Sequence, residues 1–146
     1  MAKIDPGSIF EIEIDGEFYY GICTHVHPIY GELIRMVRGG SRRHVTNHPR
    51  YHKSDILFSF FFPLSAAVMR GIVRIVDRGP ISASLSEFPL FRVRGFGSMW
   101  WVWNGVDEYK IGALTTEARK LPVRGIWNDT ILKERIRAGY APEREE

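Results

Sequence analysis

The sequence contains one cysteine, Cys23, in 146 residues, so no internal disulfide can form. The fold must therefore depend on packing and hydrogen bonds, which is usual for proteins of a reducing compartment. Long apolar runs are also lacking, because residues 56–69 are interrupted by two serines and a proline and are shorter than the roughly 20 residues that cross a bilayer. The first residues have no apolar core of the kind a secretory signal needs. We expect a cytoplasmic protein with no membrane partner.

Motifs that bind nucleotides or cofactors are absent as well. There is no P-loop and no G-x-G-x-x-G, and the loose Gly95-x-Gly97 pair precedes an aromatic segment instead of a helix. Glu11 and Glu13 face away from the apolar side of an alternating segment, which predicts a solvated face without acid–base chemistry. The sequence predicts no cofactor and no catalytic residue.

The histidines offer a weak metal pattern. His44, His48 and His52 have i, i+4, i+8 spacing, but Pro49 interrupts any helix that would align them. Nearby arginines would also repel a dication, and a metal site needs three or four convergent ligands. We expect solvent-exposed histidines and no metal.

Cys23 and His25 are the only candidates for a nucleophile and its base. Two residues apart on a strand, they would share a face with Cβ atoms roughly 7 Å apart. A nucleophile and its base need about 3 Å between donor and acceptor. The spacing favours a half-buried structural thiol, and a small hydrolase remains a third interpretation that thiol reactivity would test.

The order of alternating segments predicts an α+β protein. Residues 8–14 and 18–26 alternate around Asp15-Gly16, the strongest short-range hairpin signal, and further strands are expected at 30–38, 56–62, 72–76, 90–94, 99–104 and 108–112. Short helices are expected at 65–69 and 115–119, and a C-terminal helix that Asn128 or Asp129 can cap and that Gly139 closes. This indicates mainly antiparallel β structure, a curled sheet or small barrel, in a single globular domain over residues 1–140 with a frayed, charged tail at 141–146.

Charge is distributed unevenly along the chain. Residues 1–34 are acidic, whereas residues 35–53 hold six cations and no acid. Four of these cations fall in an expected exposed loop at 39–53, and Arg35 and Arg38 precede it. Loops of this length in compact domains are usually functional or disordered. We predict partner binding through this segment, although a solvated loop that balances the acidic hairpin explains the charges equally well. The candidate residues are Arg35, Arg38, Arg42, Arg43, Arg50, Lys53 and Tyr51.

The aromatic run at 100–103 adds a second candidate surface. Trp101 and Trp103 are expected on one face of a strand and Trp100 on the other. One face would belong to the core, and the other could anchor a partner. A strand buried on both faces explains the run equally well.

Several structural motifs resemble the immunity protein 26 family of bacterial polymorphic-toxin systems. The resemblance covers most of the chain and rests on Pro6-Gly7-Ser8-Ile9-Phe10, Asp15-Gly16, Tyr20-Gly21, Phe62-Pro63-Leu64, Phe88-Pro89-Leu90-Phe91-Arg92, Trp101-x-Trp103-x-Gly105, Leu121-Pro122, Ile126-Trp127-Asn128 and Leu132-x-x-Arg135-Ile136. It implies a mostly β fold, no catalytic residues and a role as an antidote that binds and neutralises a protein toxin.

The charge pattern, taken without the resemblance, predicts an acidic partner surface. An antidote with this loop would meet an acidic patch on its toxin and associate faster for it. The alternative is a small basic nucleic-acid-binding module, since clustered arginines also suit phosphates.

Overall fold

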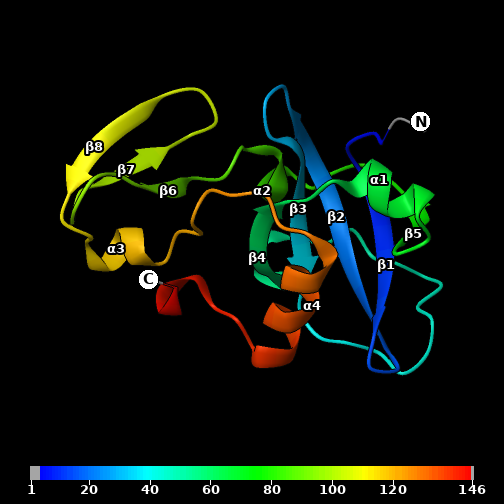
Figure 1. Cartoon of the computed structure of the whole chain (residues 1–146). Helices are drawn as coiled ribbons and strands as arrows, with labels where there is room; N and C mark the ends of the chain where they lie inside the picture. Colours follow the sequence, from blue (N-terminus) through cyan, green and yellow to red (C-terminus); the bar gives the residue numbers. More distant parts are fainter. Residues whose placement is uncertain (1–3, 146) are drawn as a thin grey trace.

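The computed structural model describes residues 4–145 as two antiparallel sheets with short helices (Figure 1). Met1–Lys3 and Glu146, at the outer ends of the expected domain and tail, lie outside the described residues. The larger sheet has the order β4-β3-β2-β1-β5 and the smaller one β6-β7-β8. The strands are β1 (Ser8–Ile14), β2 (Glu17–His27), β3 (Gly31–Val37), β4 (Ile56–Phe61), β5 (Arg74–Arg78), β6 (Phe91–Arg94), β7 (Trp100–Trp103) and β8 (Glu108–Gly112).

The helices are short, except for one near the C-terminus. They are η1 (Lys53–Asp55), α1 (Leu64–Met69), α2 (Ala83–Ser86), α3 (Thr116–Arg119), α4 (Asp129–Ala138) and η2 (Pro142–Arg144). The predicted positions agree closely with the strands and with α1, α3 and α4. The short helices α2, η1 and η2 were not predicted, and α2 falls in a segment that we expected to be a loop. Among the described residues, none of the helices has the length and apolar character needed to cross a membrane.

The α+β class with mainly antiparallel strands is confirmed, but the expected curled sheet or small barrel is not observed. Within residues 4–145 both sheets are open, and β4 and β5 form the edges of the larger one. The β1–β2 hairpin forms as predicted. Asp15 and Gly16 adopt φ values of 53° and 81°, the positive values that a two-residue hairpin turn requires.

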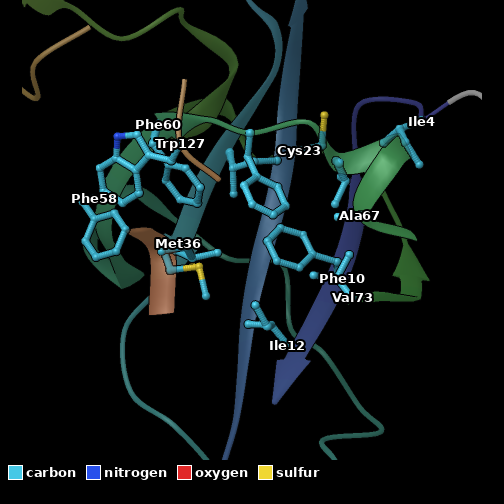
Figure 2. Close-up of a cluster of buried hydrophobic side chains, with 14 of the residues drawn as sticks. Ile4, Phe10, Ile12, Cys23, Met36, Phe58, Phe60, Ala67, Val73 and Trp127 are labelled. Carbon is cyan, nitrogen blue, oxygen red and sulfur yellow. The ribbon is translucent and has the colours of Figure 1, made fainter. Parts of the chain in front are cut away.

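One face of the larger sheet packs against α1 and α4 (Figure 2). Phe10 from β1 and Phe60 from β4 belong to this buried cluster, and Trp127 stacks on Phe60 with ring centroids 4.5 Å apart. Leu132 of α4 is fully buried in the same cluster. Asn128 caps α4, its side chain accepting from the Ile131 amide, and Gly139 ends the helix at φ 64°. This C-terminal helix and its end at Gly139 were predicted, and Asn128 is one of the two N-cap candidates that the sequence offered.

The opposite face is covered by the segment between β3 and β4. Val45 and Tyr51 of that segment pack against Ile9, Ile22 and Leu85. A third buried cluster joins the two sheets, with Leu33 and Phe61 on the larger sheet and Phe91 and Trp103 on the smaller. The larger sheet is therefore buried on both faces.

The C-terminal tail is docked, which corrects the expectation of a frayed segment for residues 141–145. Arg92 is fully buried, and its guanidinium donates hydrogen bonds to the carbonyl oxygens of Leu121, Pro142 and Glu145. The Glu145 side chain also accepts a hydrogen bond from the hydroxyl of Tyr140. A buried guanidinium that needs carbonyl acceptors thus fixes the position of the tail.

Candidate functional site

We call the segment from Gly39 to His52 the basic loop. It is bound along the face of the larger sheet that lies opposite α1 and α4. Near its start, Ser41 and Phe18 exchange two backbone hydrogen bonds of 2.7 and 2.9 Å. Further on, the Val45 amide donates to the hydroxyl of Tyr20 at 2.7 Å. Figure 1 shows the loop passing the tip of the β1–β2 hairpin before it returns to β4. The segment is therefore held against the sheet at defined points.

Glu11 provides the main attachment for the loop, and our prediction that it faces solvent is wrong. Its side chain is 6% exposed and accepts hydrogen bonds from Tyr20 (2.7 Å), Arg74 (3.0 Å) and Nδ1 of His44 (2.9 Å). Burial acts to raise the pKa of Glu11, but these hydrogen bonds outweigh it and hold the pKa below its ordinary value. Glu11 is therefore an ionised carboxylate that joins β1, β2, β5 and the loop.

The far end of the loop is attached through Tyr51. Its backbone carbonyl accepts a 2.7 Å hydrogen bond from Ser82, and its hydroxyl lies 2.8 Å from Nδ1 of His48. Burial raises the pKa of the Tyr51 hydroxyl. Just beyond the loop, the Lys53 amide donates to the Ser84 hydroxyl at 2.9 Å. Tyr51, which we expected at the binding surface, is instead half-buried beneath it.

The predicted cations divide into two groups. Arg38, Arg42, Arg43, Arg50 and Lys53 are exposed, and within residues 4–145 none of them forms an ion pair with a carboxylate. Arg35, by contrast, is 5% exposed, and its guanidinium donates to the carbonyl of Glu87. The structure therefore places five of the seven candidate residues at the surface and two beneath it.

The edge strand β5 extends this cationic surface, which sequence reasoning missed. Arg74 reaches Glu11, and Arg78 lies with Arg50 on the wall of a hollow of about 300 Å³. Buried Ile9 is among the residues that line the same hollow. Arg74 and Arg78 are the first and last residues of β5. The pairing of β5 with β1 is a long-range contact that no local pattern indicates.

Cys23 and His25 do not form a catalytic pair. The register between β2 and β3 shifts between these two residues, so that Cys23 pairs with Ile34 and His25 with Leu33, and the two side chains lie on opposite faces. The Cys23 side chain is fully buried in the core (Figure 2), and burial raises the pKa of its thiol to about 12. Such a thiol cannot serve as a thiolate nucleophile near neutral pH.

The histidines are dispersed among different contacts. His25 lies 2.9 Å from the Ser86 carbonyl, His27 lies 2.8 Å from the Gly105 carbonyl, and His44 binds Glu11. Burial lowers the pKa of His25. In the part of the chain that the structure describes, no group of three or more His, Cys, Asp or Glu residues is placed to hold a metal ion.

The aromatic strand β7 is covered on both faces. Trp103 lies in the cluster between the sheets, and the guanidinium groups of Arg92 and Arg94 each lie 4.7 Å from the centre of the Trp100 ring. Trp100 and Trp103 are 7% and 4% exposed. The aromatic run is therefore largely structural, and Trp101 alone among its tryptophans is partly exposed.

Comparisons of the chain with the models of known protein families, with curated proteins and with solved structures find no match. The basic loop, with the Glu11 attachment beneath it, is the candidate site that the geometry itself provides.

Proposed function

We propose that this protein is a non-catalytic binding protein that neutralises a protein toxin by docking its basic loop on an acidic patch of that toxin. The observation that carries the proposal is a loop held to the sheet by hydrogen bonds, whose exposed cations have no carboxylate partner within residues 4–145. The resemblance to the immunity protein 26 family suggests the toxin as the partner.

The attachment of the loop favours binding in a physical sense. A loop that is already ordered loses little conformational entropy when a partner binds, which improves affinity. Arg42, Arg43 and Arg50 are exposed. The loop that carries them is bonded to Glu11 through His44, to Tyr20 through the Val45 amide, and to Ser82 through the Tyr51 carbonyl. Arginine forks suit bidentate contacts with carboxylates. An acidic protein surface meets these requirements.

The position of Tyr51 favours a protein partner over a nucleic acid. Modules that bind single strands stack bases on exposed aromatic rings beside a basic groove. Here Tyr51 packs against the buried cluster that contains Ile9 and Leu85. His44 stacks on Phe18 with ring centroids 4.0 Å apart. The loop therefore presents guanidinium groups with few rings for bases to stack on.

The direct test is co-expression with the toxin candidate, which the proposal places in the C-terminal domain of the protein encoded by the adjacent upstream reading frame. Cells that produce that domain should survive only when this protein is present, and the two chains should copurify. A neighbour that is not toxic, or toxicity that this protein does not relieve, would refute the proposal. Titration with generic oligonucleotides tests the alternative, because phosphate contacts weaken steeply with salt.

A further inference from the structure

Arg35 is a buried cation without a counter-ion. It lies on β3 opposite Ser59 of β4, and its side chain is 5% exposed. Nη2 donates one hydrogen bond of 3.1 Å to the Glu87 carbonyl, Nε has no partner, and no carboxylate among the described residues forms an ion pair with the side chain. Burial of an uncompensated charge costs several kcal/mol in proteins, so such an arrangement calls for an explanation.

Arg92 is a second buried arginine, and its hydrogen bonds show how this protein pairs a buried guanidinium that has a structural role. Arg92 donates to three carbonyl oxygens and packs on the Trp100 ring, leaving only Nη1 without a partner. Arg35 has one carbonyl and no stacked ring. Burial accordingly lowers the pKa of Arg35 to about 10, and no neighbouring charge offsets that effect. Its hydrogen-bonding capacity is largely unused.

Arg35 lines a hollow of about 350 Å³ bordered by β4 and by the loop segments at 89–90 and 120–122. Lys53 and Lys120 contribute two further cations to the lining, and Lys120 lies 3.9 Å from Glu117. Among the described residues no acid lines this hollow, whereas Glu87 lines an adjoining hollow that shares Arg35 and Lys53. The remainder is mostly apolar and includes Ile56, Leu57, Pro89, Leu90, Leu121 and Pro122. Cations beside an apolar wall suit a ligand that has an anionic group attached to an apolar chain or ring.

We infer that this hollow binds a small organic acid, a carboxylate joined to an apolar chain or ring, with the carboxylate on Arg35 and the apolar part against Leu57, Leu90 and Leu121. The site is separate from the exposed arginines of the basic loop. It therefore does not depend on the proposed toxin binding, and either can fail without the other.

Titration of the isolated protein with hexanoate, followed by the NMR signals of the Arg35 guanidinium, tests the inference. Hexanoate should shift these signals to saturation and bind at least about 10-fold more tightly than 1-hexanol or inorganic phosphate, since a charge-assisted bidentate contact and apolar burial both contribute. No saturable shift, or phosphate binding as tightly as hexanoate, would overturn the assignment.

Substitutions separate the contributions of the cations. Arg35→Met should stay folded, because apolar replacement of a buried charge is often neutral or stabilising, and it should abolish the binding of hexanoate. Lys53→Ala and Lys120→Ala should each weaken binding several-fold, whereas Lys110→Ala, an exposed lysine on β8, should not. Full binding by Arg35→Met, or by Lys53→Ala and Lys120→Ala combined if Arg35→Met does not fold, would contradict the inference.

Discussion

Nδ1 of His44 lies 2.9 Å from both carboxylate oxygens of Glu11, although the two residues are 33 positions apart in the chain. This contact fixes the basic loop to β1, the strand next to the edge strand β5. Because Glu11 also accepts from Tyr20 and Arg74, one buried carboxylate determines the position of the surface to which we assign binding.

Removing the charge of Glu11 should release the loop. Glu11→Gln leaves Tyr20, Arg74 and His44 with one neutral acceptor oxygen in a buried site, so we expect the free energy of unfolding to fall by about 2–4 kcal/mol. Amide hydrogen exchange at residues 41–51 should rise in the same variant. Glu13→Gln changes an exposed carboxylate on the same strand and should alter stability by less than about 0.5 kcal/mol. Equal effects of the two substitutions would contradict the role given to Glu11.

The stabilising effect of Glu11 should depend on pH in one direction. The pKa of Glu11 is lowered from its ordinary value of 4.5 in the folded protein, so ionised Glu11 favours the folded state. This contribution is fully present above pH 4.5 and is lost as the pH falls through the lower, folded-state pKa. Chemical denaturation of the wild type and of Glu11→Gln should give a constant difference near pH 7 that shrinks below pH 4.5. A difference that grows on acidification would be inconsistent with this assignment.

The limits of sequence reasoning can be seen at the same residue. The alternation of residues 8–14 correctly predicted β1 and the face that holds Phe10 and Ile12, because one apolar face of a strand is a local property. It could not show that the other face is also buried. That face is covered by the basic loop, which has no apolar periodicity and packs through scattered residues such as Val45.

Two other differences between the sequence predictions and the structure also arise from long-range contacts. The register shift between Cys23 and His25 places them on opposite faces, and no turn residue in the segment indicates it. The tail was expected to fray because it is charged, but its backbone carbonyls satisfy buried Arg92, a partner about fifty residues earlier. In both cases a long-range contact decided what a local pattern could not.

The thiol of Cys23 should react only when the protein unfolds. Full burial and a pKa of about 12 leave almost no accessible thiolate at pH 8. Labelling with a thiol-specific disulfide reagent should therefore proceed at the rate of opening and accelerate with denaturant. Rapid, stoichiometric labelling of the native protein would restore the hydrolase interpretation.

Loss of the Arg92 contacts should destabilise the protein through the tail. Arg92→Met removes the donor to three carbonyl oxygens, and we expect a loss of about 2–4 kcal/mol together with faster proteolysis after Tyr140. Arg94→Met is a matched control, because Arg94 stacks on the same Trp100 ring but is exposed. If Arg94→Met were as damaging as Arg92→Met, the tail contacts would not be the cause.

The rate of association with the proposed toxin partner tests the central claim most directly. The variant Arg42→Glu, Arg43→Glu and Arg50→Glu should associate at least about 10-fold more slowly than the wild type at low ionic strength, with the difference shrinking as salt is added. Lys110→Glu, Arg119→Glu and Arg144→Glu change the net charge equally at exposed positions outside the basic loop and should slow association far less. Equal rates for the two triple variants at low salt would contradict capture of the partner by the basic loop.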